Sequence, residues 1–212
     1  MDWIEDEWLV FTNIIFVLVI SYSNKHRAYV YITILSSVTF SSYFYHLCQI
    51  SHSKCILPFA IMKGNDHMQS MTLFNLIPFI FIHHMCRSTV YARIFIAALF
   101  LLFNFVLIVV FHTANVYYIF INILGMGIVV LCVYWLVYPK ITLEIFKESV
   151  HLHKIILALI TGSIALFFFT FPDFANPQLY KTMHGTWHIV NAMAQIFLFQ
   201  SLKPLSETML PE

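Results

Sequence analysis

The sequence predicts an all-α membrane protein: a bundle of seven transmembrane helices whose N-terminus is outside the cytosol or in a lumen and whose C-terminus is cytosolic. Three observations predict this class: the composition, a series of long apolar runs, and an uneven distribution of Lys and Arg. Of the 212 residues, 60% are hydrophobic and 10% are charged, and the mean hydropathy is +0.82. A soluble domain carries about a quarter charged residues. A lipid solvent accommodates the apolar surface that a small soluble core cannot bury.

The apolar runs give the number of helices, because crossing a bilayer takes about 20 apolar residues per helix. The connections between the runs are short and contain no linker or repeat, so we expect one seven-helix domain over 1–212. The acidic N-terminal residues have the wrong sign for a secretory signal peptide, so we expect the first run to be a retained helix. The first and third runs are the shortest. The seven runs are 8–23, 28–48, 68–84, 90–111, 116–138, 152–171 and 179–202.

Lys and Arg give the orientation, because cytosolic loops carry an excess of them. The net charge of +1 gives no indication of a nucleic-acid partner. Eight cationic residues fall on the side that holds the C-terminus, which is therefore cytosolic: Lys25, Arg27, Arg87, Arg93, Lys140, Lys147, Lys154 and Lys203. Three fall on the other side: Lys54, Lys63 and Lys181.

Ionisable side chains inside or beside a membrane span are costly and usually functional. His184 and His188 stand four residues apart in the last run, which places both imidazoles on one face of a helix and suits a shared metal ion. Asn191 and Gln195 continue the same face. The alternative is a pair of interfacial histidines in a belt of Trp and Tyr, and the spacing alone does not separate the two.

Two further polar positions flank the second and third runs. Ser42 and His46 lie one helical turn apart at the end of the second run. Taken alone, His46 is more typical of a hydrogen-bonded packing residue than of a ligand. Asp66 stands just before the third run, where an N-cap for that helix is the favoured interpretation.

The orientation brings these positions together. The second run ends, and the third and seventh begin, on the outer side, so His46, Asp66, His184 and His188 fall at one depth. Three histidines with an open fourth position form the ligand set of a catalytic Zn²⁺ site. Asp66 could then orient a water molecule or accept its proton, and Ser42 could hold the water or a developing oxyanion. Such a site suits hydrolysis of a membrane lipid amide or ester.

Cys48 and Cys55 also lie on the expected outer side, seven residues apart. A disulfide between them is a reasonable expectation, because that compartment is oxidising.

The same residues resemble the pattern of a membrane hydrolase superfamily that includes alkaline ceramidases and the progestin and adiponectin receptors. The shared features are Ser-x-x-x-His at Ser42 and His46, the Asp at position 66, and His-x-x-x-His at His184 and His188. The resemblance implies that the histidines bind zinc, with Ser42 and Asp66 beside it. It covers the whole seven-helix length, but only three short patches are specific.

Within that superfamily the chain is most similar to the transmembrane-protein-8/myomaker family, through Cys48, Cys55 and Gln69 around the His and Asp and through the stretch 183–188. The match to the N-terminal calcium motif of ceramidases is poor, since Ile4 stands in place of the usual Cys. The tail 206–212 lacks the cysteine-rich end of vertebrate myomaker.

The resemblance implies two uses for the site. The first is a zinc-dependent hydrolase of membrane lipids, similar to a ceramidase or a phospholipase A2. The second is a protein that promotes myoblast-type cell–cell fusion, with a structural zinc, acting as a homo-oligomer or with a partner fusogen. By analogy the plasma membrane is the expected location, with the Golgi and the ER as alternatives.

Overall fold

The structure, a computed structural model, describes residues 2–25, 28–86, 147–174 and 179–203, with four single residues between 95 and 106. These residues are nearly all helical. Their only strand-like pairing is the single antiparallel bridge between Val150 and Leu202. The all-α prediction is therefore confirmed for the part of the chain that the structure describes. The two expected spans 90–111 and 116–138 lie outside the described residues, apart from the isolated positions.

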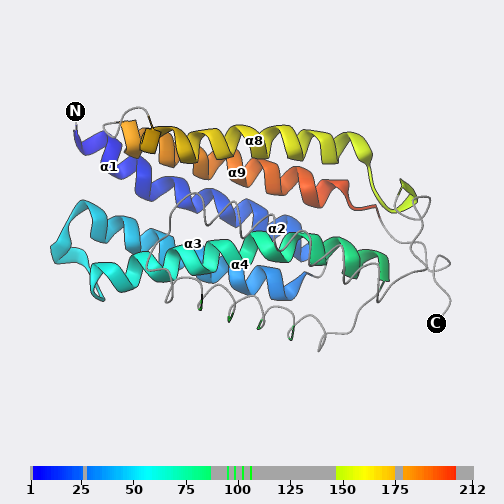
Figure 1. The fold of residues 1–212 in the computed structure, drawn as a ribbon, viewed down its shortest axis with the longest axis horizontal. Helices are drawn as coiled ribbons and strands as arrows, with labels where there is room; N and C mark the ends of the chain where they lie inside the picture. The colour runs from blue at the N-terminus through cyan, green and yellow to red at the C-terminus, as the bar shows by residue number, and fades with distance from the viewer. Residues whose placement is uncertain are drawn as a thin grey trace.

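The remaining five runs each coincide with helical structure (Figure 1). The first run lies within a nearly continuous helical stretch, in which a 3₁₀ turn, η1, separates two α-helices. The elements are α1 (Asp2–Phe11), η1 (Thr12–Ile15), α2 (Phe16–Lys25), α3 (Tyr29–Ile50), η2 (His52–Lys54), α4 (Phe59–Cys86), α8 (Leu152–Phe174) and α9 (Tyr180–Ser201).

The third helix starts earlier than the hydropathy predicts. We expected a run from residue 68, whereas α4 begins at Phe59. Pro58 directly precedes it, and the Pro58 carbonyl accepts the backbone N–H groups of Ile61 and Met62. The fixed φ of proline is compatible with a helix start, and its missing N–H is not needed there. Polar residues follow the apolar first turn of α4, and one of them bonds to α3: the Asn65 side-chain amide donates to the Ser41 hydroxyl at 2.9 Å.

This earlier start corrects the interpretation of Asp66. A helix that begins at Phe59 places Asp66 in its third turn, so the carboxylate is not the N-cap that we favoured from the sequence. Its side chain is buried, with 7% of its surface exposed. An acidic side chain buried at this position requires an explanation other than capping.

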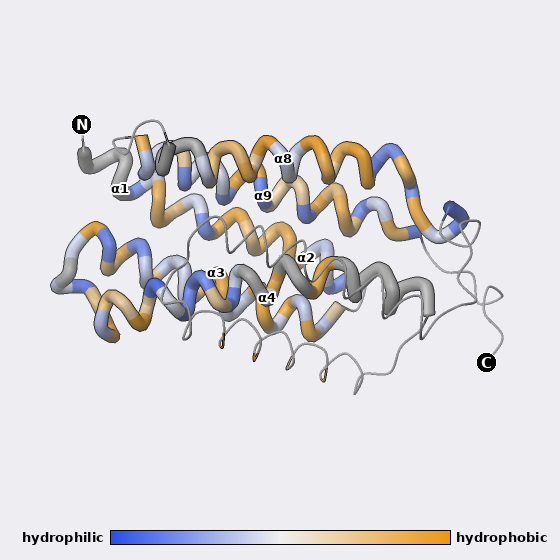
Figure 2. Tube along the Cα trace, in the orientation of Figure 1, coloured by the Kyte–Doolittle hydropathy of each residue, from blue (hydrophilic) through white to orange (hydrophobic). Residues whose placement is uncertain are grey.

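Within the described residues, two helical stretches are long and apolar enough to cross a membrane by length and composition: Glu7–Lys25 and Leu152–Thr170. The second has the higher hydropathy and is only 11% buried within the fold. Figure 2 shows α8 as a largely hydrophobic helix along one edge of the described bundle. Its exposed side chains include Leu159, Ile160 and Phe167. A core helix of a soluble protein would bury such residues, so this outward apolar face is typical of a lipid-facing helix.

Helix α9 holds the described elements together. It packs most extensively on α8 and also contacts α1, η1 and α2, while α3 pairs with α4 and contacts α2, α1 and η1. The main buried cluster lies between these helices and includes Val19 of α2, Leu35 of α3, Leu73 of α4 and Phe199 of α9. Helices α3 and α8 run opposite to α4 and α9 (Figure 1). The end of α3 and the starts of α4 and α9 therefore meet at one end of the bundle.

Helix α1 packs on α9 at Gly185, where the Trp8 side chain lies directly against the glycine. A Cβ atom built on Gly185 would lie 2.5 Å from Nε1 of Trp8 and 3.4 Å from the Thr12 hydroxyl oxygen. The Trp8 indole N–H donates to the Thr182 carbonyl at 3.4 Å. Glycine is therefore required at this position by the approach of α1, whereas a Cβ on Gly162 of α8 would meet only the Cβ of Ala194 at 4.0 Å.

We expect Gly185→Ala to destabilise the protein by about 1–3 kcal/mol, because the indole must move and lose its hydrogen bond. The measurement is the thermal unfolding temperature of purified protein in detergent. Gly162→Ala is the matched control. It should leave the temperature unchanged or raise it slightly, since alanine favours a helix over glycine where space exists. An equal effect of the two substitutions would contradict a close α1–α9 contact.

Candidate metal centre

Three histidines converge at the end of the bundle where α3 ends and α9 begins. His46 comes from α3, and His184 and His188 come from successive turns of α9. One ring nitrogen of each lies within 4.8 Å of the other two. The ring centroids are 5.1 Å apart for His46–His184, 5.3 Å for His46–His188 and 4.9 Å for His184–His188. The structure therefore brings together the three histidines that the sequence singled out.

All three rings are buried, and each has one nitrogen without a protein partner. The unpaired atoms are Nε2 of His46, Nδ1 of His184 and Nε2 of His188. A buried polar atom without a hydrogen bond costs about 1–3 kcal/mol. Three such atoms in one small volume are a poor solution for packing alone. They are the donor set that a metal ion would satisfy, so the residues present fit zinc.

Hydrogen bonds to the opposite ring nitrogens prepare two of the histidines for this role. Nδ1 of His46 lies 3.0 Å from the side-chain oxygen of Gln49, which can only accept a hydrogen bond. The Thr12 hydroxyl donates to the Leu9 carbonyl at 3.1 Å and therefore accepts from Nδ1 of His188 at 2.9 Å. Both rings thus carry their proton on Nδ1 and direct the lone pair of Nε2 into the cluster. Fixing the tautomer through the second nitrogen is the usual support of a metal-binding histidine.

Aromatic side chains enclose the cluster. The His184 ring contacts Tyr180, Trp187 and Phe169, with centroids 5.0, 4.9 and 5.7 Å away. Phe16 stands edge-on to His188 at 6.1 Å. These rings exclude water from the histidines and lower the local dielectric constant, which strengthens the binding of a cation by neutral imidazoles.

Ser42 and Asp66 form a pair beside the cluster. Ser42 lies one turn before His46 on α3, and its hydroxyl hydrogen-bonds to the Asp66 carboxyl. Asp66 lies ahead of the expected span 68–84. Burial raises the pKa of its carboxyl, and the hydrogen bond from Ser42 acts in the opposite direction. One carboxyl oxygen, Oδ1, has no partner in the protein. Asp66 is not among the clustered ligand atoms, so it suits a role next to a metal rather than on it.

Sequence reasoning missed the residues that orient the rings. Thr12 and Gln49 were not predicted, although Thr12 is a polar residue in an apolar run. Gln49 stands three residues after His46, a spacing that places both on one face of a helix. Asn191 and Gln195, predicted to extend the histidine face of α9, are both buried. The Gln195 side-chain oxygen accepts a hydrogen bond from the Tyr31 hydroxyl on α3.

Cys48 and Cys55 form a disulfide, with Cα atoms 4.5 Å apart. The sequence expectation is thus confirmed. Cys48 is fully buried two residues after His46, and Cys55 lies in the connection that leads to α4. The bond closes the turn between α3 and α4 directly beside the cluster. It restricts the end of α3 that carries His46.

The fold and the cluster define an all-α protein with a buried three-histidine centre and an adjacent Ser–Asp pair. A family model described as a protein of unknown function, DUF3522, matches residues 6–189. This range includes every residue of the centre, and the chain belongs to this family. No curated protein matches the chain.

We expect the double substitution Cys48→Ala/Cys55→Ala to lower the stability by about 2–3 kcal/mol, because it reopens a short loop that the disulfide closes. The measurement is the unfolding temperature with and without a reductant. Reductant should destabilise the wild type and leave the double variant unaffected. Identical responses of the two proteins would show that the disulfide does not support this end of the bundle.

Proposed function

We propose that this protein is an integral membrane, zinc-dependent hydrolase of lipid amides or esters, built as seven spans in the manner of the transmembrane-protein-8/myomaker family. The observation that carries the proposal is the set of three unpaired imidazole nitrogens beside a hydrogen-bonded Ser–Asp pair. Three neutral histidines leave one position of a tetrahedral ion for water or substrate. The outward apolar face of α8 and the Lys and Arg distribution support the membrane setting and an N-terminus outside the cytosol.

The division of labour follows from the positions of the side chains. Zinc, when bound, supplies a Lewis acid that polarises a carbonyl and lowers the pKa of water to about 7. Asp66 holds the attacking water through its unpaired Oδ1, accepts a proton from it and returns the proton to the leaving group. Ser42 donates to the other side of the carboxyl and fixes its orientation. The enclosing aromatic rings exclude bulk water and present an apolar wall to a lipid substrate.

The second candidate function is fusion of cell membranes, with a zinc that only holds the helices together. The observation that favours it is the complete burial of the His46 and His188 rings, which would let an ion crosslink α3 and α9. Both candidates require zinc. They differ in whether lipid is consumed.

The first experiment measures zinc in purified wild-type protein by mass spectrometry. We expect about one ion per chain, and we expect His184→Ala and His188→Ala to lose it, since two histidines bind zinc weakly. His153→Ala is the matched control because this exposed histidine lies in the first turn of α8, far from the cluster. Full zinc content in the His184 and His188 variants would rule out this centre.

The second experiment separates the two candidates by lipid turnover. Asp66→Asn and Ser42→Ala should retain zinc, and Asp66→Asn should lower the hydrolysis of a ceramide and phospholipid panel by about 10²–10⁴-fold. Wild-type protein that binds zinc and hydrolyses no lipid in the panel would contradict the hydrolase. Mixing of contents between two cell populations that express the protein would then support the fusion function.

Thr12→Val tests the support of His188 without touching the ligands. We expect zinc affinity, measured by competition with a chelator, to fall by about 10–100-fold, as for other partners of metal-bound histidines. Thr39→Val is the matched control, because the Thr39 hydroxyl bonds only to the Leu35 carbonyl of its own helix at 2.8 Å. Unchanged affinity in Thr12→Val would remove Thr12 from the centre.

A further inference from the structure

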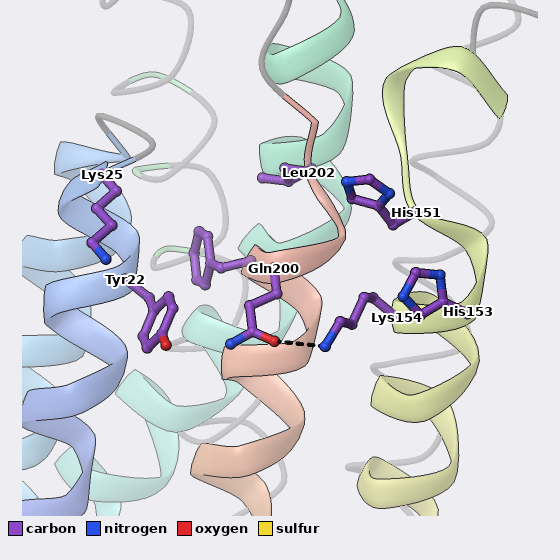
Figure 3. Close-up of a pocket in the computed structure, with 8 residues that line it drawn as sticks. Tyr22, Lys25, His151, His153, Lys154, Gln200 and Leu202 are labelled. Carbon is purple, nitrogen blue, oxygen red and sulfur yellow. Dashed lines mark hydrogen bonds between the residues drawn. The ribbon is translucent and has the colours of Figure 1, made fainter.

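A second candidate site lies at the other end of the bundle, where α2 and α9 end and α8 begins (Figure 3). It is a cavity of about 410 Å³. This volume lies in the range of small-molecule sites. From His184 to Gln200 along α9 the separation is about 24 Å, at 1.5 Å per helical residue. The cavity is therefore distinct from the histidine centre. Its lining residues are Tyr22, Lys25, His151, His153, Lys154, Phe199, Gln200 and Leu202.

The walls of this cavity are tied together by hydrogen bonds. The backbone N–H of His151 donates to the Ser201 carbonyl at 2.7 Å, and Val150 pairs with Leu202. The Lys154 ammonium donates to the Gln200 side-chain oxygen at 3.1 Å, as the dashed line in Figure 3 shows. The start of α8 is thus fixed to the end of α9, which sets the shape of the open, shallow cavity between them.

The charge of the lining is one-sided. Two lysines and two histidines face the cavity, and none of the eight lining residues within the described part of the chain is acidic. The Lys25 ammonium lies 5.0 Å from the centre of the Tyr22 ring, and Lys154 has donors beyond the one used by Gln200. His151 and His153, with ring centroids 5.8 Å apart, add imidazole donors from the start of α8. Several N–H donors around one cavity suit a ligand with several anionic oxygens.

The apolar surroundings indicate that such a ligand has hydrocarbon attached. Phe199 and Leu202 form part of the wall, and Leu152 and Ile156 are exposed on α8 beside it. Both lie in the first two turns of α8, and the exposed Leu159 and Ile160 follow them on the same helix. A free anion would make no use of this path, whereas the acyl chains of a lipid would lie along it.

We propose that this cavity binds the headgroup of an anionic phospholipid that carries a phosphate monoester, as phosphatidic acid does. A monoester carries a charge of about −1.5 to −2 at neutral pH, which matches two lysines better than a diester does. By the Lys and Arg distribution the cavity faces the cytosolic leaflet, where basic pockets between helices hold such headgroups. The proposal requires the membrane setting. It does not depend on zinc or on hydrolysis.

The test is native mass spectrometry of the full-length protein in detergent, titrated separately with phosphatidic acid, phosphatidylserine and phosphatidylcholine. We expect phosphatidic acid to be retained at least about tenfold better than phosphatidylcholine. Lys25→Gln/Lys154→Gln should reduce this retention by up to about thirty-fold, from roughly fivefold per lysine. His151→Gln/His153→Gln, which keeps both lysines, should reduce it severalfold. If the elution profile shows that Lys25→Gln/Lys154→Gln does not fold, the histidine variant tests the cavity in its place.

The matched control is Lys54→Gln/Lys63→Gln, which removes two exposed lysines near the opposite end of the bundle. It should retain phosphatidic acid within about twofold of the wild type. Equal losses in the control and in the cavity variants would show a diffuse charge effect and overturn the site. Inorganic phosphate that displaces the lipid as well as short-chain phosphatidic acid does would assign the cavity to free phosphate and overturn the lipid proposal. Zinc content should be unaffected in all variants, so failure here is distinguishable from failure of the metal centre.

Discussion

The described bundle depends on one constraint: three imidazole rings must be buried together with a free nitrogen on each. These nitrogen atoms accept no hydrogen bond from the described residues. The surrounding helices must therefore hold the rings in place against the cost of desolvation. They do so with the Thr12 and Gln49 contacts, with the aromatic enclosure of His184 and with the neighbouring disulfide. Helices from widely separated parts of the chain meet at these rings, and their packing holds the rings together.

The two ends of the bundle are chemically different. One end holds the enclosed histidines, with aromatic rings and a Ser–Asp pair. The other has a cavity lined by lysines and histidines next to apolar surface. The proposed hydrolysis and the proposed headgroup binding therefore use opposite ends of the bundle. Helix α9 contributes to both ends, and it packs along α8 between them.

Much of the histidine centre could be predicted from the sequence, because helical spacing and the Lys and Arg distribution constrain the same residues. His184 and His188 follow from a four-residue repeat, and His46 follows from the direction of its helix. Two things could not be predicted. Hydropathy hides the start of α4 because the stretch 63–67 is mostly polar, and a contact that hydropathy does not reveal, from Asn65 to Ser41 of α3, lies in this stretch. The contact of Thr12 with His188 joins residues 176 positions apart, which no local pattern encodes.

The packing of α1 on α9 has a consequence for biosynthesis. The ribosome makes Thr12 176 residues before His188, yet these two residues meet in one contact, beside that of Trp8 with Gly185. Throughout translation, the N-terminal helix therefore waits for a partner that has not yet been made. A chain that stops before Tyr180 leaves His46 buried without its companions and α1 without its neighbour. The contact between Thr12 and His188 can therefore form only after residue 188 has been translated.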